Sequence, residues 1–138
     1  MVYDKKYSVV HEWLRRFNLH EVEGLLELYV EKPAHTSMDI KKAHPKTYGT
    51  IYGRTPLSQW WYRCFECDPN LRYEMDLYLS SGGDTAVLVY FEGVGGGNPP
   101  AHRMITFTFE GLLIKSTKTE DVDDHSSHIR GAINPRAN

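Results

Sequence analysis

The feature that most constrains this fold is a change in the hydrophobic period near residue 70. Before that point, apolar residues recur at helical spacing in three segments, around residues 9–17, 22–29 and 56–65. From Leu71 onward, apolar and polar residues alternate one by one, as they do in a half-buried strand. The chain therefore predicts helices first and a β-sheet afterwards.

Local signals delimit these segments. Pro33 ends the second helical pattern, and Thr55 places a capping hydroxyl before a proline at the start of the third, which Asp68-Pro69 ends. A strand over residues 34–39 and a polar loop are expected in between. Gly-rich turns then separate four predicted strands, over residues 71–79, 85–92, 101–109 and 112–120.

Three helices followed by a meander predict an α+β domain, with the helices packed on a curved, mainly antiparallel sheet. A chain of 138 residues that is 41% hydrophobic is large enough for one core. We expect one domain over residues 1–121 and a polar tail over residues 122–138. The strand at 85–92 is apolar on both faces and needs a cover on each, so a homodimer is also expected.

Composition excludes several classes of partner. With 16 basic and 18 acidic side chains, no excess of charge points to nucleic acid or to an anionic membrane. No segment approaches the roughly 20 apolar residues of a membrane span. The first residues lack the apolar run of an export signal and there are two cysteines, so we expect a cytoplasmic protein.

Three motifs are not expected to have a redox, phosphate-binding or metal-binding role. Cys64 and Cys67 lie at the end of a predicted helix, where the helix dipole raises a thiol pKa, so they are not expected to form a redox pair. The glycine run at 95–97 precedes no helix and is interpreted as a flexible rim. His125 and His128 are interpreted as part of a solvated tail, and we expect no metal and no cofactor.

The order of elements and several short motifs resemble the nuclear-transport-factor-2-like superfamily, which includes ketosteroid isomerases and SnoaL-type polyketide cyclases. The resemblance spans residues 5–121 and implies a cone-shaped domain around an apolar pocket. It specifies no reaction, because the fold hosts unrelated functions. The motifs that carry it are Trp13–Asn18, Leu28-Tyr29, Tyr52–Leu57 and Asp68–Arg72.

Ketosteroid isomerase chemistry itself is disfavoured. The resemblance places Trp13 and Ile105 where those enzymes carry their two oxyanion donors, and neither side chain can do that work. It places Ser37 at the position of the catalytic base, one alternating step from Asp39.

The resemblance also predicts which residues point into the cone. They are mostly apolar, and such a lining shifts the pKa of any polar group among them. The predicted inward set is His35, Ser37, Val87, Val89, Phe91, Arg103, Ile105, Phe107, Ser116, Lys118 and Glu120.

Within that set we identify candidates for chemistry. His35 suits a general base or a ligand contact, with a purely structural histidine as the alternative. Asp39 and Glu120 are the candidate carboxylates, although for Asp39 an exposed loop cap is the favoured interpretation. Arg103, Lys118 and Glu120 form a buried ionic set unless the strand register is slipped by one residue, which sends all three to solvent.

Trp13 and Trp61 are candidate ligand walls, with core packing as the alternative. The function these residues indicate is cofactor-independent acid–base chemistry on a small, largely apolar, oxygenated molecule, of an isomerase, cyclase, dehydratase or hydrolase type. The alternative is a non-catalytic ligand-binding or dimerisation module. The number of ionisable side chains inside the cone separates the two.

Overall fold

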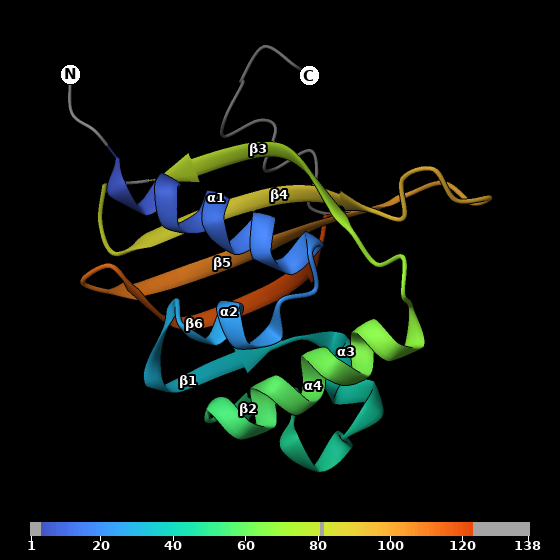
Figure 1. Cartoon of the computed structure of the whole chain (residues 1–138), viewed down its shortest axis with the longest axis horizontal. Coiled ribbons are helices and arrows are strands. Elements are labelled where there is room, and N and C mark those ends of the chain that lie inside the picture. The colour runs from blue at the N-terminus through green and yellow to red at the C-terminus, as the bar shows by residue number, and fades with distance from the viewer. Residues whose placement is uncertain (1–3, 81, 123–138) are drawn as a thin grey trace.

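The computed structural model describes residues 4–80 and 82–122, which form helices packed on one curved six-stranded sheet (Figure 1). The expected α+β class is confirmed. The helical elements are α1 (Lys5–Asn18), α2 (Val22–Leu26), α3 (Met38–Ala43), the short 3-10 helix η1 (Pro45–Thr47) and α4 (Arg54–Cys67). The strands are β1 (Tyr29–Thr36), β2 (Thr50–Tyr52), β3 (Tyr73–Ser80), β4 (Thr85–Glu92), β5 (Ala101–Glu110) and β6 (Leu113–Asp121).

The sheet has the strand order β2-β1-β6-β5-β4-β3, which runs from bottom to top in Figure 1. The predicted meander is confirmed, because β3, β4, β5 and β6 pair in sequence as antiparallel neighbours. Strand β1 returns beside β6 in parallel, and β2 pairs with β1 at the edge. The carboxyl end of β1 therefore lies beside the end of β6.

Helix α1 forms because one face is apolar and its first turn is capped. The Asp4 carboxylate accepts the Lys6 amide hydrogen at 3.0 Å, and Trp13, Leu14 and Phe17 are buried on the inner face. These side chains pack on the sheet and hold the helix there.

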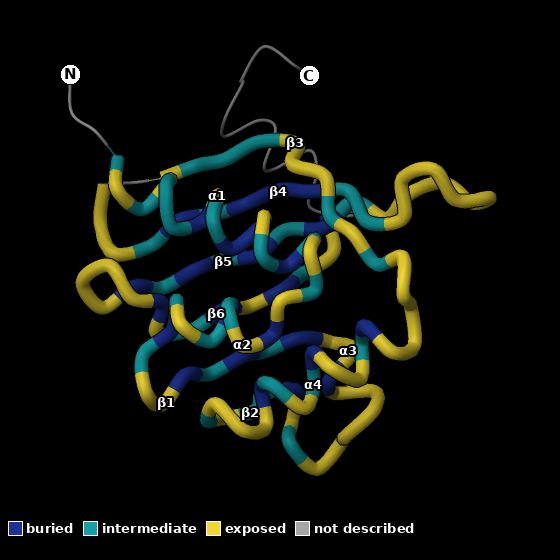
Figure 2. The backbone as a smooth tube through the Cα atoms, in the orientation of Figure 1, coloured by how far each residue is buried: buried dark blue, intermediate teal, exposed yellow. Residues whose placement is uncertain are grey.

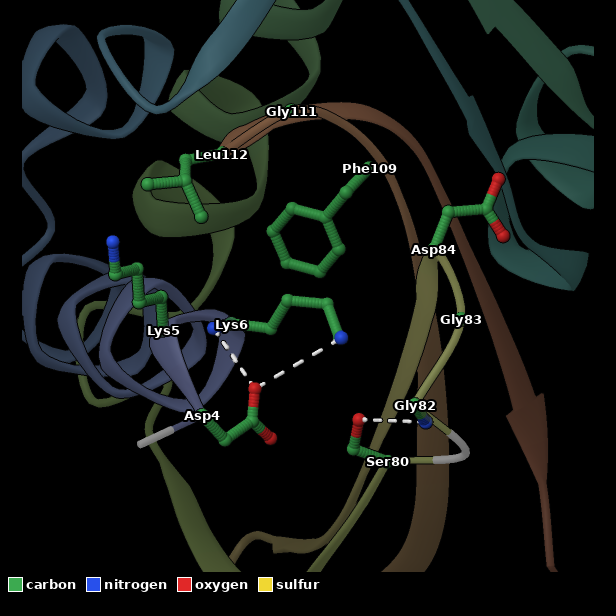
Figure 3. A pocket seen from close by; sticks show the side chains of 10 residues that line it. All are labelled: Asp4, Lys5, Lys6, Ser80, Gly82, Gly83, Asp84, Phe109, Gly111 and Leu112. Carbon is green, nitrogen blue, oxygen red and sulfur yellow. Dashed lines mark hydrogen bonds and ion pairs between the residues drawn. The ribbon is translucent and has the colours of Figure 1, made fainter. Parts of the chain in front are cut away.

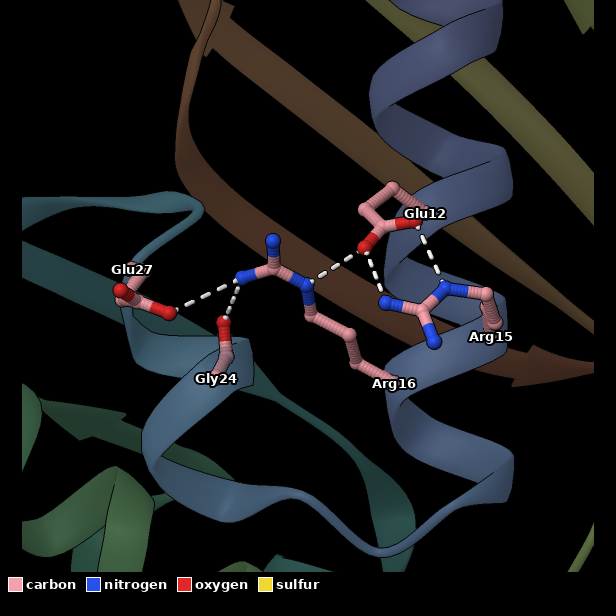
Figure 4. Close-up of polar contacts among 5 residues, drawn as sticks. All are labelled: Glu12, Arg15, Arg16, Gly24 and Glu27. Atoms are coloured by element: carbon pink, nitrogen blue, oxygen red, sulfur yellow. Dashed lines mark hydrogen bonds and ion pairs between the residues drawn. The ribbon is translucent and has the colours of Figure 1, made fainter.

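The polar face of α1 also ties it to α2 (Figure 4). The Arg16 guanidinium donates to the Glu12 carboxylate at 2.8 Å, to the Gly24 carbonyl at 2.5 Å and to the Glu27 carboxylate at 3.2 Å. Hydrogen bonds from Arg15 and Arg16 lower the pKa of Glu12 to about 2. One arginine thus joins two helices at the outer surface.

Several predicted boundaries were wrong. The second helix ends at Leu26, and Tyr29 opens β1, where its side chain is fully buried. The predicted strand over 34–39 stops at Thr36, because the Ser37 hydroxyl accepts the Ile40 amide hydrogen at 3.0 Å and caps α3. Asp39 therefore lies in the first turn of α3. Neither α3 nor β2 was predicted from the sequence.

Helix α4 also begins earlier than predicted. Its N-cap is Gly53 at φ 99°, a left-handed conformation that favours glycine, and the helix starts at Arg54 before Thr55 and Pro56. Strand β3 starts two residues after the predicted Leu71, at Tyr73.

The core lies between the inner face of the sheet and α1, α2 and α4, and the buried stretches of β1, β4 and β5 are dark blue in Figure 2. Its centre is aromatic. The ring of Phe17 stacks on Trp13 and on Tyr73, with centroids 5.0 and 4.1 Å apart, and Tyr73 stacks on Tyr90 at 4.1 Å. Offset stacking of this kind adds to the free energy gained by burial.

Strand pairing shows which side chains share the inner face. Arg103 pairs with Asp121, Ile105 with Thr119 and Phe107 with Thr117. The odd-numbered residues in the second half of β6 therefore lie on the inner face of the sheet. On β4 the inner residues are the even-numbered ones, which belong to the core cluster or line the cavity: Ala86, Leu88, Tyr90 and Glu92.

The predicted inward orientation of two strands was therefore wrong. Val87, Val89 and Phe91 of β4 lie on the outer face, opposite Thr106, Met104 and His102. Ser116, Lys118 and Glu120 of β6 lie on that face too, where the Lys118 ammonium pairs with the Glu120 carboxylate at 3.0 Å. The predicted buried ionic set of Arg103, Lys118 and Glu120 does not form.

A β-bulge explains the error on β6. Ile114 pairs with Phe109 and Ser116 with Thr108, so Lys115 is an extra residue on β6. Alternation that starts at the buried Ile114 is reversed after Lys115. On β4 both faces are apolar, so the alternation of residue types did not show which face of the strand packs against the helices.

The folded domain includes Val122, which is buried and whose amide hydrogen donates to the His102 carbonyl at 3.0 Å. The expected polar tail beyond it, with His125 and His128, lies outside the described residues.

Candidate functional site

A cavity of about 280 Å³ opens between α3, α4 and the inner face of the sheet. Its floor carries His35 at the end of β1, Arg103 on β5 and Thr119 on β6. A narrow space of about 30 Å³ continues from it towards α1, lined by Trp13, Trp61 and Ile105 among others. The cavity thus joins a charged floor to an aromatic interior.

Arg103 is the centre of the charged floor. Its Nε donates to the Asp121 carboxylate at 3.0 Å, and its Nη1 donates to Asp39 at 3.1 Å and to Glu92 at 3.4 Å. Burial opposes its charge, but Tyr90 and the surrounding carboxylates raise the pKa of Arg103 above its usual value. One buried guanidinium thus faces three carboxylates, which leaves the cluster with an excess of negative charge.

Glu92 is a carboxylate of the cluster with a raised pKa. Burial raises the pKa of its carboxyl group, Arg103 opposes that rise, and Asp39 and Asp68 add to it. The side chain is 29% exposed and lines the cavity. A carboxyl group held in this way exchanges a proton nearer to neutral pH than an ordinary glutamate does.

His35 is buried on the same floor. Its Nδ1 lies 2.6 Å from the Thr117 hydroxyl oxygen. Burial lowers the pKa of His35 to about 4, a hydrogen bond with the Thr117 backbone partly opposes this shift, and the nearby Arg103 charge lowers the pKa further. The imidazole is therefore neutral at pH 7, and a cationic role in that range is excluded.

Behind His35 lies a row of buried polar groups. The Trp13 indole Nε1 donates to the Tyr29 hydroxyl at 3.0 Å, and the neighbouring Thr117 side chain acts on the pKa of that hydroxyl. Burial raises the pKa of Tyr29, so its hydroxyl stays protonated. Trp13 thus holds Tyr29 in place by a hydrogen bond, in addition to its packing in the core.

The walls are aromatic and sulfur-containing. Trp60, Tyr73 and Leu71 face the cavity beside Cys64 and Cys67 of α4, which are both free. Burial raises the pKa of the Cys64 thiol to about 11. This direction agrees with the prediction that Cys64 is not an activated thiol, although burial is its first cause.

Other hollows lack a comparable floor. One of about 610 Å³ is an open depression beside the first turn of α1, lined by the Asp4, Lys5 and Lys6 side chains and by residues of two turns (Figure 3). Lys118 and Glu120 border another surface hollow, next to Tyr48. In both, the charged side chains named here are open to solvent or paired with one another.

The described residues contain no group of three or more His, Cys, Asp or Glu side chains that could hold a metal ion. Within residues 4–80 and 82–122, no helix is long and apolar enough to span a membrane.

The structure brings together some predicted site residues and separates others. His35, Ser37, Asp39 and Arg103 line the main cavity, and Trp13, Trp61 and Ile105 line its inner extension. Phe107 is a core residue whose ring meets Trp13 edge-on, with centroids 5.3 Å apart. Val89, Phe91, Lys118 and Glu120 lie on the opposite face of the sheet.

Glu92, Tyr73 and Thr119 line the cavity but were not predicted to do so. The only signal for Glu92 was its charge at the end of an apolar strand. That signal identifies a cavity residue only once it is known which face of β4 points inward. The sequence gave no signal for Thr117 and Tyr29, because their contacts lie between β1 and β6. These strands are far apart in the sequence; His35 and Thr117, for example, are separated by 82 residues.

No protein-family model matches the sequence, and no curated protein matches it either. Solved structures do match. A SnoaL-like protein of unknown function from Burkholderia thailandensis superposes with a TM-score of 0.73 at 19% identity, covering 88% of this chain and 98% of that one. The fold is the nuclear-transport-factor-2-like fold. The resemblance found in the sequence is thereby confirmed for the fold.

Two further structural neighbours were solved with small molecules. TerC, co-crystallised with polyporic acid, has a TM-score of 0.71 at 12% identity over 91% of this chain and 97% of its own. A ketosteroid-isomerase-like protein from Catenulispora acidiphila, in complex with trimethylamine, has a TM-score of 0.64 at 19% identity over 81% and 83%. At these identities the likeness concerns the fold alone.

Proposed function

We propose that the protein binds a small, partly apolar, oxygenated organic molecule in the cavity and transfers a proton on it without a cofactor. The observation that carries this proposal is the presence of Glu92, with a raised pKa, and neutral His35 in one cavity. Groups whose environments move their pKa values in this way are typical of acid–base sites.

The roles follow from the charges. Glu92 is the proton acceptor or donor, because its carboxyl group is the one that burial holds closer to neutral pH. Asp39 is more than half exposed at the cavity edge and positions Arg103. Glu120 has no part in the proposal, since it faces away from the cavity. The aromatic walls formed by Trp60 and Tyr73 hold the apolar part of the ligand.

The neighbours support a small organic ligand. One was crystallised with polyporic acid and another with trimethylamine, and both share this fold. We also propose a cytoplasmic location, because two cysteines are too few for the disulfide scaffold of a small secreted domain.

A specific observation favours the alternative, a non-catalytic binding module. Asp39, Glu92 and Asp121 all contact Arg103, so the ion cluster satisfies itself without a ligand. In that case the ion cluster stabilises the ends of β4, β5 and β6, and the cavity binds a ligand without reacting with it.

Proton transfer can be measured without knowing the natural substrate. We expect the protein to accelerate hydrogen–deuterium exchange at the α-carbon of small aryl and cyclic ketones in D2O, followed by NMR. Glu92→Gln should reduce this rate by about 10²-fold or more, because a positioned general base contributes about that factor. Glu110→Gln, an exposed change at the far end of β5, is the control.

If the ketones bind with unchanged affinity to wild type and to Glu92→Gln, and neither accelerates exchange, the binding-module function is the correct one. Equal exchange rates in wild type and Glu92→Gln would remove Glu92 from the proposal.

We also propose that the protein is a homodimer. Leu77, Leu79, Val87 and Met104 are half-buried on the outer face of the sheet, while α1, α2 and α4 all pack on the inner face (Figure 1). A second copy would cover these apolar side chains.

Sedimentation at micromolar concentration should give about twice the 15.9 kDa chain mass. Met104→Glu should shift the protein to the monomer, because dimerisation would bury the new carboxylate in an apolar interface. Met38→Glu, an exposed change on α3, should leave the dimer intact. A wild-type protein that remains monomeric would contradict the proposal.

A further inference from the structure

The floor of the cavity holds more carboxylate charge than guanidinium charge. The Arg103 guanidinium donates to Asp39 at 3.1 Å and to Glu92 at 3.4 Å, and both carboxylates line the cavity beside it. A third carboxylate, that of Asp121, accepts from the Arg103 Nε at 3.0 Å. Three carboxylates against one guanidinium leave negative charge in excess, and an excess remains when Glu92 takes up a proton. The floor is therefore negative in either state of Glu92.

The other charged side chains of the described lining do not compensate for this excess. Arg63 and Asp68 also line the cavity, but both are exposed and they carry opposite charges. His35 is neutral at pH 7, because burial lowers its pKa to about 4. Since a cleft with charge of one sign concentrates the electric field, a positive group in this cavity is attracted and a negative one is repelled.

The aromatic wall of the same cavity also suits a cation. Trp60 of α4 lines both the main cavity and its inner extension. Its ring contact in the described part of the chain is with His44, at 6.2 Å and an angle of 68°, so no described ring is stacked on the indole. Tyr73 differs, because Phe17 and Tyr90 are each stacked on it at 4.1 Å. In the main cavity the indole of Trp60 is thus the aromatic surface left for a ligand, and the face of an indole attracts positive charge.

We infer that this cavity selects organic cations, so that the oxygenated ligand of the proposed function carries a positively charged group such as an ammonium. Asp39, Glu92 and Trp60 all line the one cavity of about 280 Å³ and are the side chains that recognise the cation. An anion is not expected at Arg103, because this guanidinium already has three carboxylate partners. The inference rests on the proposed function only in taking the cavity as the ligand site, and it does not require proton transfer.

Three probes of similar shape test the sign of the charge: choline, its uncharged isostere 3,3-dimethylbutan-1-ol, and the anion 3,3-dimethylbutanoate. Each Kd is measured by 1H–15N NMR titration of the wild-type protein at pH 8, and the Trp60 indole signal reports binding in the cavity. Choline should bind about tenfold more tightly than the alcohol, as expected when charge attraction and a cation–π contact act together. The anion should bind more weakly than the alcohol.

Glu92→Gln removes one negative charge from the floor and keeps the size of the side chain. It should weaken choline binding by about 3- to 10-fold and leave the affinity for the alcohol unchanged, because only the cation depends on that charge. Glu110→Gln removes the same charge from an exposed position at the far end of β5 and should change neither affinity. Trp60→Leu, followed through the Trp61 indole signal, should weaken choline binding relative to the alcohol by about 2- to 5-fold.

Equal affinities of choline and the alcohol, or tighter binding of the anion, would overturn the inference. The same holds if Glu92→Gln and Glu110→Gln weaken choline binding equally, because the cation would then respond to the overall charge of the protein. If no probe binds while the ketones of the exchange assay do, cation selection fails and the proposed function stands. If neither the probes nor the ketones bind, both fail. The comparison of the three probes uses the wild-type protein and so does not depend on how well a variant folds.

Discussion

Arg103→Met is expected to destabilise the protein by about 3 kcal/mol at pH 7, the lower end of the range for removing one partner of a buried ion pair. The Arg103 side chain is 10% exposed and is the shared partner of Asp39, Glu92 and Asp121. Without it, three carboxylates repel one another inside one cluster. The lower end applies because Asp39 and Asp121 are more than half exposed and can be hydrated.

The pH dependence of this variant identifies the cause. Repulsion raises the carboxylate pKa values in the folded variant above those in its unfolded chain, so the folded state binds protons more readily. The deficit relative to wild type should therefore shrink as the pH falls from 7 towards 5. Arg63→Met, an exposed change at the cavity mouth, should alter stability by no more than about 0.5 kcal/mol.

Urea unfolding followed by tryptophan fluorescence gives both quantities. A deficit equal to that of Arg63→Met at every pH would show that the carboxylates do not depend on Arg103.

The second large effect is loss of stability in mild acid, caused by His35. Its pKa is about 4 when folded against a usual value of 6.5, so the unfolded chain takes up the proton first as the pH falls. The free energy of unfolding should therefore decrease from about pH 6.5 down to about pH 4. A difference of about 2.5 pKa units corresponds to roughly 3 kcal/mol.

His35→Gln should lack this component, so its stability should depend less on pH between 6.5 and 4 than that of wild type. The exposed His11→Gln is the matched control and should keep the wild-type slope. Urea unfolding at intervals across that range provides the test. Parallel curves for wild type and His35→Gln would mean that His35 is as easily protonated in the folded protein as in the unfolded chain.

The sequence by itself determined the architecture. Apolar spacing at Val10, Trp13 and Phe17 requires a helix, and alternation after Leu71 requires strands, because each pattern matches only one backbone period. The resemblance also predicted that His35, Ser37 and Arg103 face one cavity, with Asp39 as a candidate carboxylate beside them. For β5 the alternation was unambiguous, since Arg103, Ile105 and Phe107 share one face.

Tertiary structure alone decided the composition of the charged floor. A single extra residue at Lys115 reverses the face of every side chain after it on β6, and only pairing with β5 reveals that bulge. On β4 both faces are apolar, so the orientation that brings Glu92 to Arg103 depends on which face α1 covers. The hydrogen bonds behind His35 join residues far apart in the chain, and contacts of that kind leave no period in a sequence.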